Sequence, residues 1–257
     1  MSELKFTIGE NRERPPYLGK TLRCPSCNAS ISMYSEQSQL VVCESCGQNL
    51  DCSKEDLIAL GKTGTVDGFL FQVHQVCNWK GVKYKVIGRI LLLDEWDGQY
   101  AEYLLFHPFH GTRWLSIYTG EEGTDCSFSE SLRVLSKEKP FSASKGETIA
   151  TEDGEKWRFE EQSVLKVSYV DGALPWLVKV GDVQTAAEFI NTKNKKSYLT
   201  VEKSLLTDKN TGKEIKELEY SFSKEATMSS VYKAFSMGEK TSQMSAASSS
   251  SLPNSFR

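Results

Sequence analysis

The sequence predicts a mostly β protein that begins with a small metal-bound ribbon, and three observations carry this prediction. Two Cys-x-x-Cys pairs stand close together before residue 52, a pattern typical of zinc ribbons. Alternating runs of β-branched and aromatic residues, bounded by turn residues, follow between residues 69 and 222. Only the stretch before residue 235 spaces its apolar residues as a helix does. We therefore expect a small four-cysteine zinc ribbon, two small antiparallel β-barrel-like modules, a short C-terminal helix and a disordered tail.

Composition places the chain among ordinary folded proteins. Of its 257 residues, 39% are apolar and 25% are charged, which excludes disorder of the whole chain. The longest aliphatic run, residues 90–93, is far shorter than the roughly 20 residues that cross a bilayer, so no transmembrane segment is expected. The first twenty residues contain no apolar signal region, and a cytoplasmic location is the expectation.

Charge is spread evenly along the chain. Residues 1–52, 53–138 and 139–257 carry net charges of −1, −3 and +1. None of these segments forms the basic surface that non-specific binding of nucleic acid requires. The lysines at 193, 195 and 196 lie in a polar stretch typical of a solvated loop.

The metal site is the strongest motif. Residues 1–18, with Pro15-Pro16, are expected to form a flexible arm, and residues 19–52 form the ribbon. Fifteen residues separate the two knuckles, whose cysteines are Cys24, Cys27, Cys43 and Cys46. Each knuckle directs two thiolates at one point, and together they give a tetrahedral shell with metal–sulfur distances of about 2.3 Å. Such a shell leaves no open position for substrate, so we expect structural Zn²⁺.

These cysteines have three other interpretations. Iron fits the same four-thiolate shell. Two disulfides are disfavoured without a secretory signal, because cytosolic thiols stay reduced. Four unrelated thiols would leave the spacing unexplained. Cys52 is expected to be a packing thiol, and Cys77 and Cys126 have no visible partner.

The two β modules are expected at residues 53–138 and 147–222, with a linker between them. A faint repeat connects them: Gly81-x-x-Tyr84 and Gly154-x-x-Trp157 are each followed later by a Trp-Leu pair, at 114–115 and 176–177. A duplication and two unrelated hairpins explain this pattern equally well. The sequence also leaves open whether the two β regions form one barrel or two.

The C-terminal part is expected to be one helix and a tail. Residues 223–235 form the helix, with Val231, Ala234 and Phe235 on one face. Residues 236–257 are rich in serine and are expected to be disordered.

No phosphate-binding or nucleophile-elbow motif is present, so enzymatic hypotheses depend on the histidines. His107 and His110 flank Pro108-Phe109 and could work with Cys126, Asp94, Glu95 or Glu102. A hairpin loop whose histidines bond to the backbone is the simpler interpretation. The five tryptophans, in turn, either fill the core or line a ligand groove.

Several longer motifs follow the cysteines in a fixed order. The most specific is EYLLFHPFHGTRWL, from Glu102 to Leu115. The others are Leu60-Gly61-x-x-Gly64-Thr65-Val66-Asp67-Gly68, Tyr84-x-Val86-Ile87-Gly88-Arg89 and Val170-Asp171-Gly172-x-Leu174-Pro175-Trp176. Between about residues 22 and 235, the chain resembles the bacterial domain-of-unknown-function 4178 family, in its form with an N-terminal zinc ribbon. The resemblance implies an all-β protein and, through the genes that accompany the family, an accessory role in envelope stress. It implies no activity.

The leading functional hypothesis is a non-enzymatic interaction or adaptor module for a protein partner, with a membrane-associated partner as one candidate. Nucleic-acid binding through the ribbon is an alternative, although residues 17–52 hold only two basic side chains against three acidic ones. A hydrolase that uses the His107/His110 loop is the other alternative. No catalytic residue and no cofactor-binding residue besides the four metal ligands is assigned.

Overall fold

The described part of the protein is built mostly of β-strands. The computed structural model describes residues 3–4, 6–7, 19–35, 38–53, 57–62, 68–121, 123–134, 144–151, 154–207 and 214–237. The N-terminal part holds β1 (Glu3–Leu4), β2 (Phe6–Thr7), β3 (Lys20–Arg23), β4 (Ser30–Met33), β5 (Leu40–Val42), β6 (Gln48–Asp51) and β7 (Ile58–Lys62). The first β region holds β8 (Val76–Trp79), β9 (Val82–Leu93), β10 (Gln99–His107), β11 (Gly111–Gly120), β12 (Gly123–Ser131) and β13 (Arg133–Val134). The second holds β14 (Thr148–Thr151), β15 (Lys156–Leu174), β16 (Val183–Asn191), β17 (Ser197–Thr207) and β18 (Glu214–Ala226), and α1 (Met228–Ala234) follows. The prediction of a mostly β protein is confirmed.

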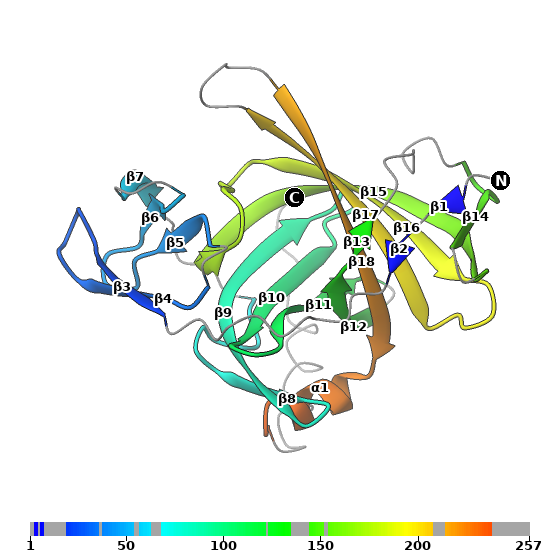
Figure 1. Cartoon of the computed structure of the whole chain (residues 1–257), viewed down its shortest axis with the longest axis horizontal. Coiled ribbons are helices and arrows are strands. Elements are labelled where there is room, and N and C mark those ends of the chain that lie inside the picture. Colours follow the sequence, from blue (N-terminus) through cyan, green and yellow to red (C-terminus); the bar gives the residue numbers. More distant parts are fainter. Residues whose placement is uncertain are drawn as a thin grey trace, which may run out of the picture.

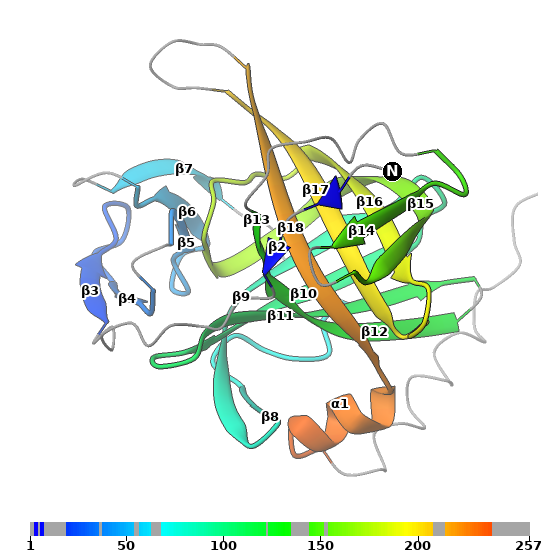
Figure 2. The same ribbon diagram turned by 45° about the vertical axis from the view of Figure 1, so that its right-hand side comes forward.

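The two β regions join in one closed barrel (Figure 1). Its strands follow the order β9-β10-β11-β12-β18-β17-β16-β15, and a further pairing of β15 with β9 closes the ring. Every neighbouring pair is antiparallel. The question that the sequence left open is thus answered, because β9–β15 and β12–β18 pair across the boundary between the regions. Figure 2 shows β15 to β18 crossing in front of β9 to β12.

Both halves of the barrel have the same plan. A short strand and a tight turn precede each four-strand meander, with β8 paired to β9 and β14 paired to β15. Gly81 and Gly154 occupy these turns with φ of 82° and 79°, in the left-handed region that glycine tolerates. Tyr84 and Trp157, each three residues later, are buried. The first part of the sequence repeat therefore falls at matching places, whereas its second part does not, since residue 114 is in β11 and residue 176 follows β15.

Both halves of the barrel are covered on the outside, which leaves the interior as a separate compartment. Side chains alternate across a strand, so Tyr103 and Leu105 of β10 point outward while Glu102 and Leu104 point inward. The outward side chains of the first half pack under β8 and α1, and those of the second half pack around Trp157 and β14. Inside, an apolar cluster fills the region beside the β9–β15 seam.

The C-terminal helix is shorter than predicted. It spans Met228–Ala234, and β18 continues to Ala226 because residues 221–226 pair with β12. Thr227 then caps the helix, in a capping box with Ser230. The predicted face is confirmed, since Val231, Ala234 and Phe235 are buried. Within the described part of the chain, no helix has both the length and the apolar character needed to cross a bilayer.

The seam between β9 and β15 depends on two glycines. Gly88 and Gly172 lie opposite each other, and a Cβ atom at Gly88 would lie 2.1 Å from the carbonyl oxygen of Ala173. At Gly172, whose φ is 74°, a Cβ atom would lie 2.3 Å from the oxygen of Ile87. Beside them, Arg89 donates to Asp171 through Nε and Nη2, at 3.0 and 2.8 Å.

We expect Gly88→Ala to lower the free energy of unfolding by about 3 kcal/mol, because backbone atoms on the facing strand cannot move aside cheaply. Urea denaturation followed by tryptophan fluorescence measures this loss. Thr124→Ala, at an exposed position of β12, serves as the control. Equal stability of the Gly88→Ala variant and the parent would show that the strands do not approach this closely.

Apart from β1 and β2, the arm at residues 1–18 lies outside the described residues, as do most of the linker and the tail beyond residue 237. The flexible arm, the linker and the disordered tail therefore stay predictions.

Candidate functional site

The four predicted ligand cysteines lie together at one corner of the ribbon. The Sγ atoms of Cys24 and Cys46 are 3.8 Å apart, and those of Cys27 and Cys43 are 3.7 Å apart. All four sulfur atoms lie within 4.8 Å of one another. A tetrahedron with metal–sulfur distances of about 2.3 Å has edges of about 3.8 Å, so the donor set fits a four-thiolate metal shell. The distances are far too long for disulfides, and all seven cysteines are free.

The two knuckles have the same backbone conformation. In each, the residue after the second cysteine takes the left-handed region, with φ of 62° at Asn28 and 69° at Gly47. In each, the N–H of that residue donates to the carbonyl of the first cysteine, four residues earlier. Hydrogen bonding from the backbone N–H of Ala29 lowers the pKa of Cys27 to about 7, which favours its thiolate, whereas burial raises the pKa of Cys43.

The remaining cysteines are not part of this cluster. Cys52 donates to the carbonyl of Ser38, and burial raises its pKa to about 11. Cys77 of β8 and Cys126 of β12 are buried in the outer cluster of the first half, and burial raises their pKa values to about 12 and 11. All three are therefore protonated packing thiols at neutral pH.

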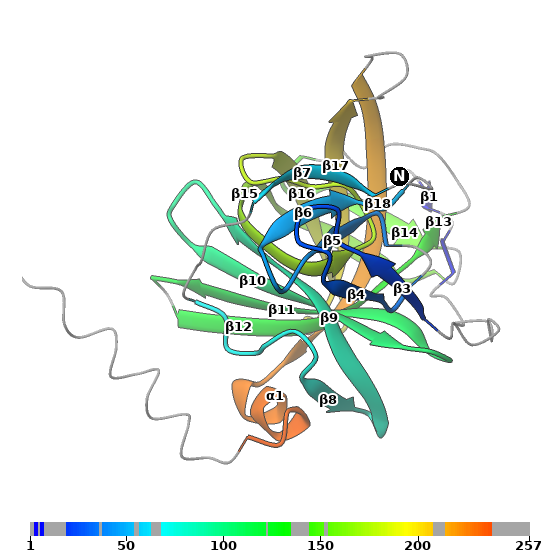
Figure 3. The ribbon, with the colours of Figure 1, turned by 90° about the vertical axis from the view of Figure 1, so that its left-hand side faces the viewer.

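The ribbon packs directly against the barrel (Figure 3). Strand β5 pairs with the end of β15, with Val41 opposite Ala173. Leu40 is fully buried in the apolar cluster inside the barrel. His74 Nε2 and Glu44 Oε1, 2.5 Å apart, connect the second knuckle to the segment before β8. The ribbon thus fixes the position of β15 at the closing seam.

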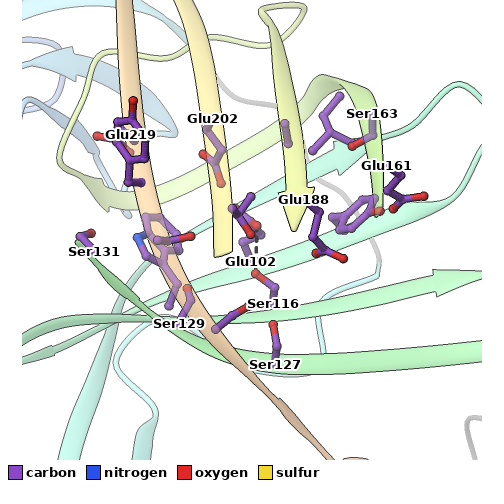
Figure 4. Close-up of a pocket in the computed structure, with 18 of the residues that line it drawn as sticks. Glu102, Ser116, Ser127, Ser129, Ser131, Glu161, Ser163, Glu188, Glu202 and Glu219 are labelled. Atoms are coloured by element: carbon purple, nitrogen blue, oxygen red, sulfur yellow. Dashed lines mark hydrogen bonds between the residues drawn. The ribbon is translucent and has the colours of Figure 1, made fainter. Parts of the chain in front are cut away.

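A second candidate site lies inside the barrel, where the apolar cluster ends. A cavity of about 130 Å³ opens between strands β10, β11, β12 and β15 to β18. Five glutamates line it, and the described residues of its wall include no lysine, arginine or histidine: Glu102, Glu161, Glu188, Glu202 and Glu219. Figure 4 shows their side chains directed from different strands toward one space. This cavity is strongly acidic, unlike the apolar interiors that fill most small barrels.

The strand register sets like charges against each other on the cavity wall. Glu161 lies directly opposite Glu188 on β15 and β16, and Glu202 lies directly opposite Glu219 on β17 and β18. Side chains at such positions have Cβ atoms about 5 Å apart, and like charges there destabilise a sheet. Glu161 and Glu219 are exposed at the edge of the cavity, whereas Glu102, Glu188 and Glu202 are partly buried within it.

Burial and mutual repulsion shift the titration of the inner glutamates. Burial, followed by the charges of Glu102 and Glu219, raises the pKa of Glu202 to about 8. Burial and the charge of Glu161 raise the pKa of Glu188 to about 7. Burial also raises the pKa of Glu102, against the hydrogen bond that its carboxylate accepts from Ser116 at 2.9 Å. Among the described residues, none donates a hydrogen bond to the carboxylate of Glu188 or Glu202.

The rest of the wall is aromatic or carries hydroxyl groups. Trp114 and Trp176 lie side by side with ring centroids 5.5 Å apart, and Tyr100, which packs on Tyr118, also lines the cavity. Hydroxyl groups come from alternate positions of β11, β12, β15, β17 and β18: Ser116, Ser127, Ser129, Ser131, Ser163, Thr200, Ser221 and Ser223. The sequence left open whether the tryptophans fill the core or line a ligand groove. Trp157 is buried in the core, whereas Trp114 and Trp176 line the cavity. Trp96 is 84% exposed in the β9–β10 turn.

The histidine hypothesis finds no supporting geometry. His107 ends β10 and accepts from the N–H groups of Phe109 and His110 through Nδ1, so it stabilises the turn. Asp94 lies at the opposite end of β10, and Glu102 points into the cavity. Cys126 donates to the carbonyl of Ala226. The structure therefore does not bring His107 and His110 together with the partners that the sequence suggested.

Of the cavity glutamates, the sequence patterns singled out only Glu102, as a partner for the histidines, although a signal for the cavity was present. Serine alternates with other residues at positions 127, 129 and 131, and glutamate at 102 and 202 occupies the face of its strand opposite to buried apolar residues. This alternation is ordinarily interpreted as a solvated face. Only closure of the barrel makes it an interior.

The family model of the domain of unknown function DUF4178 matches residues 72–219, which is more than half of the chain. This range covers seven complete barrel strands, the first part of β18 and all five cavity glutamates. No curated protein matches the chain, and no solved structure matches it.

Proposed function

We propose that this chain, which belongs to the family of the domain of unknown function DUF4178, is a non-enzymatic binding protein whose barrel holds a positively charged small molecule. The observation that carries this proposal is the cavity itself, because five glutamates line it and the described residues of its wall include no basic side chain. A carboxylate removed from water costs free energy unless a cation or hydrogen-bond donors compensate it. A bound cation supplies that compensation.

A purely structural role explains the cavity poorly. Apolar side chains at the same inward positions would fill the barrel and stabilise it, as they do beside the β9–β15 seam. The charge of Glu161 disfavours ionisation of Glu188, and the charges of Glu102 and Glu219 disfavour ionisation of Glu202, in the ligand-free protein. Shifts in ionisation of this kind are characteristic of ligand sites.

For the metal cluster we propose Zn²⁺ in a structural role. Four thiolates suit zinc, and a closed shell leaves no position for a substrate. Its contribution is to fold the ribbon, which is too small to fold on its own apolar contacts. Seven free cysteines support a reducing compartment, and we retain the cytoplasm as the proposed location.

An adaptor role is the second candidate, and one feature of the ribbon favours it. Strand β7 ends the sheet and is exposed along its whole length, with Ile58 and Leu60 42% and 47% exposed. An exposed sheet edge can accept a strand from a protein partner. This role is compatible with ligand binding, because β7 and the cavity lie in different parts of the molecule. A partner in an envelope-stress system stays part of this proposal.

The test compares small molecules of the same size and opposite charge. Thermal unfolding at about pH 8, where the inner glutamates ionise, is followed with butylammonium, 1,4-diaminobutane, butanol and butyrate at matched ionic strength. We expect at least one of the cations to raise the unfolding midpoint by about 5 °C at saturation. Butanol and butyrate are expected to have no such effect.

Two variants identify the site. Glu202→Gln removes one cavity charge and should reduce the stabilisation at a given cation concentration, whereas Glu95→Gln, in an exposed turn, should retain it. Failure of both cations to stabilise the parent protein, or equal stabilisation by butyrate, would overturn the proposed function.

A further inference from the structure

We propose that the ligand is an extended aliphatic dication, an α,ω-diamine whose two ammonium groups bind to two separate carboxylate groups of the cavity. This inference rests on the proposed function and specifies the chemical class of its ligand. Three features of the cavity carry it: the division of the glutamates, the nature of the surface beside them, and the size of the space.

The five glutamates divide into two groups. Glu161 and Glu188 form the first, facing each other on β15 and β16. Glu202 and Glu219 face each other on β17 and β18 and form the second with Glu102, whose charge acts on Glu202. In the register of β16 and β17, Glu188 lies opposite Thr200 and Glu202 lies two residues farther on. Diagonal neighbours of this kind are about 7 to 8 Å apart, so the two groups attract separate charges.

A single metal ion does not fit this arrangement. Magnesium and calcium require several oxygen ligands within about 2.6 Å of one point. Among the described residues, only the four ribbon cysteines form a group of three or more metal-ligating side chains whose donor atoms lie within 4.8 Å of one another. The glutamates are therefore too widely spaced for one ion to neutralise them, whereas a chain with a charge at each end matches them.

The surface beside the carboxylates suits an aliphatic chain. Trp114 and Trp176 present aromatic rings to the cavity, and Leu165 and Ala186 add apolar surface. Methylene groups pack on such rings, and ammonium groups near them gain cation–π attraction. Ser127 offers a hydroxyl oxygen as an acceptor for the remaining ammonium N–H bonds.

The size of the cavity limits the ligand. A volume of about 130 Å³ holds on the order of ten water molecules. A small diamine fits this space, whereas a folded protein segment or a nucleic acid does not. The inward position of the carboxylates, on the wall of a closed barrel, supports the same conclusion.

Calorimetric titration of the full chain tests the inference. A series of α,ω-diamines of increasing length is compared with monoamines of the same chain length, at about pH 8 and low salt. We expect the best diamine to bind at least about tenfold more tightly than its matched monoamine, because the second ammonium adds a charge-assisted hydrogen bond. Affinity should also pass through a maximum with chain length.

Single replacements in each group separate the two contacts. Glu188→Gln and Glu202→Gln should each weaken the diamine by about tenfold and leave the monoamine less affected, with Glu95→Gln as the exposed control. Equal affinities for diamine and monoamine, both lowered by the variants, would overturn the inference and leave the proposed function standing. Tighter binding of Mg²⁺ or Ca²⁺ than of any diamine would also overturn it. Absence of binding by every amine would overturn both.

Discussion

Replacing Cys43 and Cys46 together by serine is expected to abolish metal binding and unfold the ribbon. The two residues supply two of the four clustered thiols, and serine does not replace a thiolate as a ligand of the proposed zinc ion. Binding of a structural zinc contributes apparent free energies on the order of 10 kcal/mol to the folding of small domains, so residues 19–53 should lose their protected structure. Metal analysis measures the first effect, and hydrogen exchange measures the second.

The same experiment separates the ribbon from the barrel. Amides of β10, β11 and β17 should stay protected, because the outer clusters of the barrel do not include ribbon residues. Exchange at β15 near Leu174 should increase, since β5 and Leu40 would leave the seam. Cys52→Ser, outside the cluster, is the matched control and should bind one metal ion per chain. Stoichiometric metal in the double variant would contradict the assignment of these ligands.

The ligand-free protein is expected to lose stability as pH rises from about 5 to 8, because the inner glutamates resist ionisation in the folded state. The pKa of Glu188 is about 7 and that of Glu202 about 8 in the folded protein, against an ordinary value of 4.5. Between 4.5 and these values the folded state binds more protons than the unfolded state, so the free energy of unfolding falls with rising pH. The facing charges on β10, β15 and β18 are carboxylates too, at Glu102, Glu161 and Glu219.

Removing the charges of Glu188 and Glu202 should remove most of the dependence of stability on pH. The Glu188→Gln/Glu202→Gln double variant is expected to be more stable than the parent at pH 8 by a few kcal/mol, with little difference at pH 5. Urea denaturation at both pH values measures this, and Glu95→Gln supplies the exposed control. A parent protein whose stability is constant or rises over this range would show that the cavity glutamates are already compensated without a ligand.

Local sequence patterns predicted that the four cysteines lie together, because the geometry of each knuckle depends on a few neighbouring residues. The Cys-x-x-Cys spacing directs two thiolates at one point whatever surrounds it, and Gly47 marks the left-handed turn after the second knuckle. Asn28 takes the same conformation after the first knuckle, and asparagine tolerates that region better than most residues. Zinc itself, as opposed to a metal site, stays a proposal.

Closure of the barrel was beyond local patterns, since it depends on pairings between distant strands. Residues 166–172 pair with residues 88–93, and residues 126–131 pair with residues 221–226. No periodicity within one strand specifies such a partner. Gly88 and Gly172 have no side chain and so permit the close approach of the strands at the seam. In the sequence alone, however, a glycine inside a strand is equally consistent with a bulge, a bend or a close backbone contact.

The cavity could not be predicted for the same reason. In an isolated strand, Glu102 or Glu202 alternating with buried apolar residues indicates a solvent-facing side. That side faces the interior of the protein only when the strands of the barrel enclose it. Trp114 and Trp176, from different parts of the chain, meet at the cavity for the same topological reason.

Release of protons on binding of a diamine would show that the ligand contacts the inner glutamates of the barrel. A diamine that neutralises Glu188 and Glu202 favours their ionised forms, so binding near pH 7 must displace protons from them. Calorimetric titrations in two buffers of different ionisation enthalpy measure the number of protons released. We expect net release of protons that disappears in the Glu188→Gln/Glu202→Gln variant. Binding without proton release, or release that persists in this variant, would show that the ligand does not contact the acidic interior of the barrel.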